Sequence, residues 1–315
     1  MSLLIPDIRD HHDAHGDLEE DEKYHTLLST LKQQNPQDFL WEFESIPGFF
    51  KQTSLDTKDM EFRYTQESFG ILQDWQQIIQ SLNHLNNTSE DHIQYKLFFL
   101  ARHGQGWHNL VTKRYSKQEW FSKWRFLGTD GELTWGPDAD LTEVGINQAK
   151  ENHLAWCKEL NNGAPYPTKF YVSPLQRSIK THNITWPNTE PIIFENVRET
   201  LGLHLCHKRS TKTEIATKFP NVRFMDGFPE EDELFEKEFA EKRECLHEQF
   251  VRMNRVLQHI FDNDEDHDAI SITSHAGTIR AFITVLGHRK FTIPTGGMIP
   301  IVVKGTKRNI RQAAL

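Results

Sequence analysis

The chain contains three short runs of mostly apolar and β-branched residues, and each run stops abruptly at charged or turn-forming residues. These runs cover residues 97–101, 169–172 and 269–274. Short apolar runs with such boundaries are typical of buried strands. The residues that follow them are Arg102-His103-Gly104, Ser173-Pro174 and His275-Ala276-Gly277. In open α/β sheets ligands bind at the carboxyl ends of the strands, so we expect these residues to face a common pocket.

Helical periodicity is clearest between residues 246 and 260, where apolar residues follow one another at three- and four-residue steps. Residues 278–286 form a second apolar segment of helical length, which Gly287 ends. Strands that alternate with helices predict an α/β fold, here a three-layer sandwich with a mainly parallel central sheet flanked by helices. We expect residues 298–303 to form an edge strand, because Pro300 cannot donate a hydrogen bond within a sheet.

The composition is that of an ordinary water-soluble enzyme. A net charge of −9 argues against nucleic acid or an anionic membrane surface as a partner. The first residues lack a signal peptide, and no run approaches the roughly 18 apolar residues of a membrane span. The three cysteines are widely spaced and form no Cys-x-x-Cys motif, which indicates a reducing compartment. We therefore expect a protein of the cytosol or nucleus; the sequence does not indicate its oligomeric state.

Four residues at the predicted strand ends suggest phosphoryl chemistry. Arg102 and His103 follow the first run, His275 follows the third, and Arg177 falls in the first turn after Pro174. A guanidinium holds a phosphoryl group through a planar fork of donors, and an adjacent imidazole can attack it. Two arginines and two histidines at one sheet edge therefore predict a pocket for a small phosphorylated substrate.

These motifs resemble those of the histidine phosphatase (phosphoglycerate mutase-like) superfamily. The defining Arg-His-Gly stands at 102–104, and the second core histidine matches His275. The Leu-Thr-x-x-Gly-x-x-Gln-Ala helix start occurs at 141–149, and Ser-Pro-x-x-Arg at 173–177. Ala-Arg-His-Gly-Gln-Gly-x-His-Asn at 101–109 and Arg-Glu-Thr-Leu-Gly at 198–202 are similar to the fungal phosphomutase-like members.

The resemblance implies a two-step phosphoryl transfer without metal or cofactor. His103 would be the nucleophile, and Arg102, Arg177 and His275 would stabilise the transferred group. Glu199 matches the family's proton donor to the leaving group, although Glu195 and Glu214 are nearby alternatives. Asn109 would hydrogen-bond a phosphoryl oxygen or orient the loop that carries the nucleophile.

The chain departs from the mutase pattern where the substrate would bind. Mutases follow Arg-His-Gly with Glu-Ser, whereas this chain has Gln105-Gly106-Trp107, in which tryptophan could form an aromatic wall. Lys208 and Arg209 could bind a second anionic group or could simply be solvated. These departures favour a phosphate monoester hydrolase. The alternatives are a phosphomutase and a non-catalytic protein that senses anions.

The same patterns divide the chain into three parts. Residues 1–24 are acidic and are expected to be a disordered leader. Residues 25–95 carry too many aromatic side chains to be left in water, so this extension should pack on the core. Residues 96–315 then form the histidine phosphatase-like catalytic domain.

Overall fold

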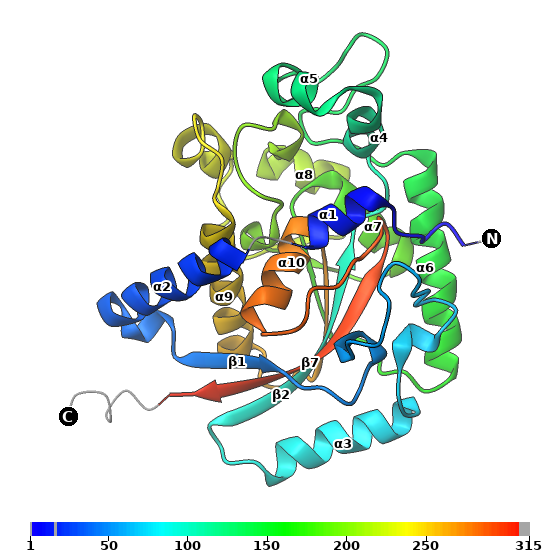
Figure 1. Ribbon diagram of the computed structural model, residues 1–315, viewed down its shortest axis with the longest axis vertical. Coiled ribbons are helices and arrows are strands. Elements are labelled where there is room, and N and C mark those ends of the chain that lie inside the picture. The colour runs from blue at the N-terminus through cyan, green and yellow to red at the C-terminus, as the bar shows by residue number, and fades with distance from the viewer. Residues whose placement is uncertain (1, 16–17, 309–315) are drawn as a thin grey trace.

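The computed structural model describes residues 2–15 and 18–308, and a single seven-stranded sheet lies at its centre (Figure 1). The strand order is β1-β7-β2-β6-β3-β4-β5. Strands β2, β6, β3, β4 and β5 are mutually parallel, and β7 runs antiparallel to both of its neighbours. The bounds are β1 (Trp41–Ser45), β2 (Ile93–Arg102), β3 (Lys169–Val172), β4 (Ile192–Ile193), β5 (Arg223–Phe224), β6 (Ala269–Ser274) and β7 (Met298–Lys307). The prediction of a mainly parallel sheet is confirmed.

Helices cover both faces of the sheet, as the alternation of side chains along β2 shows. Phe99 points to the face where it meets Trp156 of α6, and Phe98 points to the other face, where it stacks on Phe261 of α9. In Figure 1, α6 and α9 accordingly lie on opposite sides of the sheet. The helices are α1 (Ile8–Ala14), α2 (Leu18–Gln34), α3 (Trp75–Thr88), α4 (Trp107–Arg114), α5 (Lys117–Ser122), α6 (Glu143–Asn161), α7 (Gln176–Thr185), α8 (Lys212–Lys218), α9 (Leu246–Asn263) and α10 (Ala276–Val285).

The expected edge strand is in fact internal. Strand β7 pairs with β2 along its whole length and with β1 from Val303 onward. Pro300 is tolerated because it lies in the part of β7 that β1 does not reach, so one side of the strand needs no hydrogen bond there.

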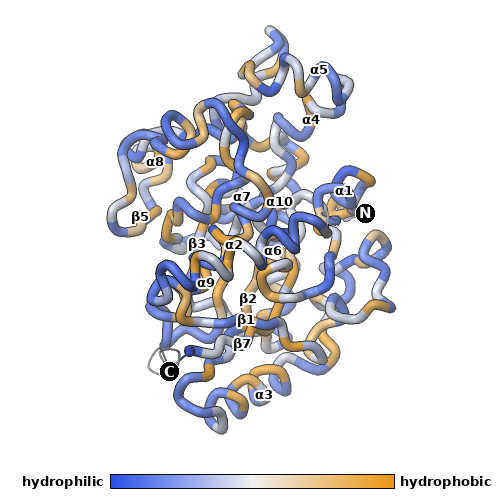
Figure 2. Tube along the Cα trace, turned by 60° about the vertical axis from the view of Figure 1, so that its left-hand side comes forward, coloured by the Kyte–Doolittle hydropathy of each residue, from blue (hydrophilic) through white to orange (hydrophobic). Residues whose placement is uncertain are grey.

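Residues 25–95 pack on the core, as their aromatic content predicts. They supply β1 to the sheet and α3 to one of its faces, and Figure 2 shows polar and apolar residues alternating along α3. Trp75 at the start of α3 is buried and packs against Phe50 and Phe69. The expected boundary between residues 95 and 96 falls inside β2, so this extension is continuous with the main sheet.

The prediction of a disordered leader is wrong for the residues that the structure describes. Asp7 caps α1 by accepting hydrogen bonds from the amides of Arg9 and Asp10. Helix α1 packs on α10, and α2 packs on α9. The acidic residues that suggested disorder here cap helices and pair with cations. None of the helices in residues 2–15 and 18–308 combines the length and apolar character needed to cross a membrane.

Candidate active site

A cavity of about 770 Å³ opens at the carboxyl ends of the parallel strands. His103 follows β2, His275 follows β6, and Arg177 lies in the first turn of α7 after β3. Glu199 follows β4 and a short 3₁₀ turn. The sheet therefore brings His103 and His275, which are 172 positions apart, into one place, because parallel strands end at the same edge.

Two hydrogen bonds fix the tautomer of His103. Its Nδ1 lies 2.6 Å from the carbonyl oxygen of Gly104, which can only accept a hydrogen bond. The proton must therefore sit on Nδ1, and Nε2 keeps its lone pair. Arg177 donates its Nε–H toward that lone pair across 3.3 Å. The imidazole is thus held with the nitrogen that carries its lone pair beside a guanidinium.

Burial and charge keep the His103 imidazole neutral. The side chain is fully buried, and desolvation together with the nearby Arg177 and Arg102 guanidinium groups holds its pKa well below the usual value. The pKa of His275 is lowered in the same way, by burial first and then by Arg177 and His103. A neutral imidazole is the form that can attack phosphorus, so the environment favours the reactive state.

Several buried nitrogen atoms around His103 have no hydrogen-bond partner within the described part of the chain. They are Arg102 Nε, His108 Nδ1, Arg177 Nη2 and His275 Nδ1. The Nε2 of His275 lies 2.7 Å from the Ser173 hydroxyl, which leaves Nδ1 of that ring for another partner. Buried polar atoms without partners are costly, so such a group around one buried imidazole indicates a place for an anionic ligand.

Arg102 is engaged by the N-terminal segment. Its Nη1 donates to Asp10 Oδ1 across 2.6 Å and to the carbonyl oxygen of Ile293 across 2.8 Å. The Asp13 carboxylate lies 3.6 Å from Nη2 of the same guanidinium. Both aspartates line the cavity, so helix α1 forms one of its walls. Sequence reasoning missed this contact, because nothing in the N-terminal sequence shows that it folds back onto the strand ends.

Glu199 is the only one of the three candidate acids that lines the cavity. Its Oε1 accepts a hydrogen bond from the Thr200 amide across 2.9 Å. A Cβ atom on Gly277 would approach this oxygen to 2.5 Å, so a larger residue there would displace the Glu199 carboxylate. Glu195 is instead paired with Arg198 and Arg209. Glu214 caps the exposed start of α8.

Only some of the residues that follow His103 line the cavity. Gln105 and Asn109 line the cavity, whereas Gly106 and Trp107 do not. Trp107 packs against the apolar cluster that contains Trp120 but does not itself reach the cavity, so the expectation of an aromatic wall from this residue is wrong. Asn109 Oδ1 accepts the Gly106 amide hydrogen across 2.9 Å, which favours its orienting role. Aromatic walls come instead from Trp120 and Phe121.

The Lys208–Arg209 pair lies outside the cavity, so its proposed contact with a second anionic group is wrong. Lys208 forms an ion pair with Glu236. Arg209 is buried and binds Glu195 and the carbonyl oxygens of residues 229–231. Its guanidinium holds the loop before the π-helix at residues 234–238 in place. The cations that do line the cavity include Arg243 and Arg280, which the sequence did not single out.

The chain is similar to several known proteins. A protein 32% identical over 286 residues, "Probable phosphoglycerate mutase" of Arthroderma benhamiae, covers 83% of this chain and 84% of its own length. "Phosphomutase-like protein 3" of Candida albicans is 40% identical over 213 residues and covers 66% of this chain and 65% of its own. Among solved structures, an ecdysone phosphate phosphatase from Bombix mori aligns at 17% identity with a TM-score of 0.43, covering 65% and 88% of the two chains.

The family comparison spans the residues that build the cavity. The model of the histidine phosphatase superfamily (branch 1) matches residues 98–296, from the middle of β2 to the loop before β7. This range is more than half of the chain and contains His103, Arg177, Glu199 and His275. The chain therefore belongs to the histidine phosphatase superfamily, branch 1.

Proposed function

We propose that the protein hydrolyses phosphate monoesters through a phosphohistidine intermediate on His103, without a metal ion or cofactor. The observation that carries this proposal is the set of unpartnered buried nitrogens around the Nε2 lone pair of His103. A phosphoryl group placed there would give each nitrogen a hydrogen-bond partner and would bring phosphorus next to the nucleophile.

In the first step, the Nε2 lone pair attacks phosphorus and the bond to the ester oxygen breaks. Glu199, protonated at that moment, gives its proton to the leaving oxygen. In the second step, water attacks the phosphohistidine and Glu199 takes up the proton of that water. The phosphorus–nitrogen bond breaks, its electron pair returns to Nε2, and inorganic phosphate leaves.

The size of the cavity favours hydrolysis of the phosphohistidine over transfer of its phosphoryl group back to the substrate. A phosphomutase must hold its substrate on the phosphohistidine and keep water away, whereas about 770 Å³ leaves room for both a small organic ester and water. The names of relatives such as "Probable phosphoglycerate mutase" keep the phosphomutase as the second candidate.

Phosphate release from a panel of phosphate monoesters, with wild type beside His103→Ala and with chelator present, tests the proposal. We expect release by wild type in chelator and none by the variant. An isomerised ester without free phosphate would establish a mutase. No turnover of any ester by folded wild-type protein would leave an anion-binding protein without catalysis.

A further inference from the structure

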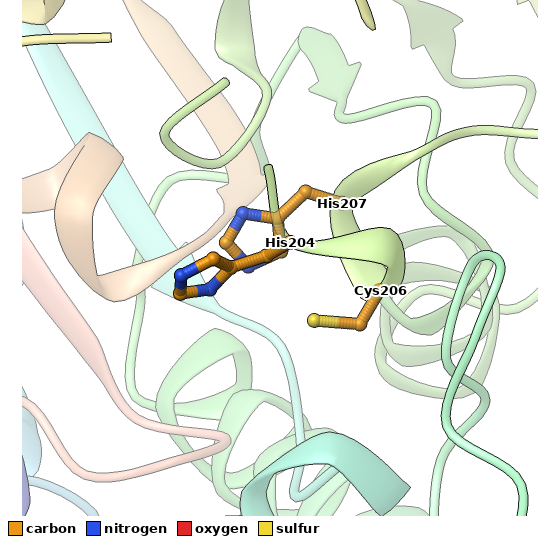
Figure 3. Close-up of side chains that lie close together, drawn as sticks. All are labelled: His204, Cys206 and His207. Atoms are coloured by element: carbon orange, nitrogen blue, oxygen red, sulfur yellow. The ribbon is translucent and has the colours of Figure 1, made fainter. Parts of the chain in front are cut away.

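A cluster of metal-binding side chains lies in the wall of the cavity, apart from the residues assigned to phosphoryl transfer. His204, Cys206 and His207 come from one 3₁₀ turn and the residue before it (Figure 3). One ring nitrogen of each histidine and the Cys206 sulfur all lie within 4.8 Å of one another. All three residues are buried, and all three line the cavity. A small inward movement of these side chains would place them at bonding distance from one ion.

The hydrogen bonding of the two histidines suits metal ligation. The Nδ1 of His207 lies 2.8 Å from the carbonyl oxygen of Thr200 and must carry the proton, which leaves Nε2 with a free lone pair. A ligating histidine commonly makes this kind of bond through its other nitrogen. The Nε2 of His204 is buried and has no hydrogen-bond partner in the described residues.

The charges nearby determine which kind of ion could bind. Two guanidinium groups lie near the cluster: Arg177 Nη1 donates to the Cys206 carbonyl oxygen, and Arg243 lines the same cavity. These cations oppose a divalent ion held by neutral ligands alone. A thiolate offsets that repulsion, so the site needs Cys206 ionised and therefore suits an ion with high affinity for sulfur.

We propose that His204, Cys206 and His207 bind one Zn²⁺ ion, and that the bound ion inhibits the enzyme. Bonds form from the ion to the sulfur and to one nitrogen of each histidine, and the thiol proton passes to the buffer. Three protein ligands leave the fourth tetrahedral position open to the cavity for water or a phosphate oxygen. Arg177 Nη1 donates to the Cys206 carbonyl oxygen across 3.0 Å, so the ion lies beside an arginine that contacts His103. Inhibition, unlike binding, rests on the proposed phosphatase activity.

Cobalt substitution tests binding without any need for activity. Metal-free full-length protein, kept reduced, is titrated with Co²⁺, and a thiolate-to-cobalt charge-transfer band in the near ultraviolet is expected. Cys206→Ser should abolish the band. Zn²⁺ should displace Co²⁺ from wild type, and the band should then disappear. Cys206→Ser should bind Zn²⁺ at least about 100-fold more weakly, since mutating even the residues that hydrogen-bond the zinc ligands typically lowers metal affinity 10- to 100-fold.

Cys157→Ser is the matched control. Cys157 is exposed, and its sulfur lies 3.6 Å from one histidine nitrogen, that of His153. This variant should keep the band. His204→Ala, which leaves the thiol in place, serves as a second site variant if Cys206→Ser unfolds. A wild type without the band, a band that survives Cys206→Ser and His204→Ala, or a band lost in Cys157→Ser would each overturn the site.

Activity then tests inhibition separately. If wild type releases phosphate, Zn²⁺ should lower its rate, chelator should restore it, and Cys206→Ser should resist the added ion. A band in the Co²⁺ titration with no effect of Zn²⁺ on phosphate release would refute inhibition while leaving the site intact. Absence of phosphate release under all conditions would instead count against the proposed function, and the Co²⁺ result would still stand.

Discussion

The Nε–H of Arg177 points at the Nε2 lone pair of His103 across 3.3 Å, and the proposed mechanism assigns the attack on phosphorus to that lone pair. The arginine therefore orients the nucleophile only while the cavity holds no phosphoryl group. When an anion enters, the guanidinium can turn its donors to the phosphoryl oxygens, and the lone pair becomes free. In the proposed reaction one residue would thus both orient the nucleophile and stabilise the charge that develops during transfer.

Arg177→Lys should lower kcat/KM by about 100-fold or more, in line with the loss of one donor from a preorganised anion site. Lysine has no Nε–H beside the ring and no planar fork, so it can neither orient His103 nor hold two phosphoryl oxygens. Steady-state kinetics on the best ester of the panel gives the measurement. Arg223→Lys, at an exposed residue paired with Glu190, is the control and should leave kcat/KM unchanged. An equal effect of both variants would contradict the role of Arg177.

Glu199→Gln should slow esters of alkyl alcohols much more than p-nitrophenyl phosphate. A general acid contributes about 10²- to 10⁴-fold when the leaving oxygen needs a proton and little when the leaving group is already a stable anion. The ratio of kcat/KM for the two esters measures this difference. Glu214→Gln, at the exposed start of α8, should leave the ratio unchanged. A loss of the same size on both esters would assign Glu199 to binding instead.

The strand ends were predictable from the sequence because their signal is local. Apolar runs that stop at Arg102, Ser173 and His275 become β2, β3 and β6, and parallel pairing alone brings those ends together. The family's Leu-Thr-x-x-Gly-x-x-Gln-Ala motif at residues 141–149 can also be recognised from a short stretch of sequence. The need for its glycine, however, comes from a contact with a distant part of the chain. A Cβ atom on Gly104 would come within 2.3 Å of the Gly145 carbonyl oxygen, so the loop after β2 and the start of α6 need glycine at this contact.

Two of the errors concern charged residues whose ion-pair partners are not their neighbours in the sequence. Lys208 and Arg209 looked like a free basic pair, yet Glu236 and Glu195 neutralise them. The acidic leader looked disordered, yet Asp10 lies 92 positions from its partner Arg102. Composition reports how many charges a segment carries, whereas only the fold decides which of them are paired.

Asp10→Ala should reduce the free energy of unfolding by about 3 kcal/mol or more, the usual cost of breaking a buried ion pair. Both side chains are at least nine-tenths buried, so the change removes the carboxylate at 2.6 Å and leaves the Arg102 guanidinium with only that of Asp13, 3.6 Å from its Nη2. Urea unfolding monitored by tryptophan fluorescence measures the loss. Glu22→Ala, at an exposed residue of α2, should change stability by less than about 0.5 kcal/mol. If the two variants are equally stable, α1 does not dock on the cavity in solution.

His182 should make the protein less stable in mild acid. The ring is fully buried in α7, its Nε2 lies 2.9 Å from the Thr189 hydroxyl, and burial lowers its pKa to about 3. In the unfolded chain the ring titrates near 6.5, so between about pH 6.5 and 3 the unfolded state binds the extra proton. Stability contributed by the neutral ring is therefore complete above pH 6.5 and falls as the pH is lowered, by about 2 kcal/mol at pH 5.

His182→Gln tests this linkage, because glutamine can still reach a hydroxyl but does not titrate. The variant should be less stable than wild type at pH 7.5, yet its free energy of unfolding should fall by about 2 kcal/mol less between pH 7.5 and 5. Other buried histidines, such as His103 and His275, titrate in both proteins and cancel in the comparison. Exposed His84→Gln should reproduce the wild-type pH dependence. A pH dependence equal in wild type and His182→Gln would mean that the ring takes up its proton without unfolding.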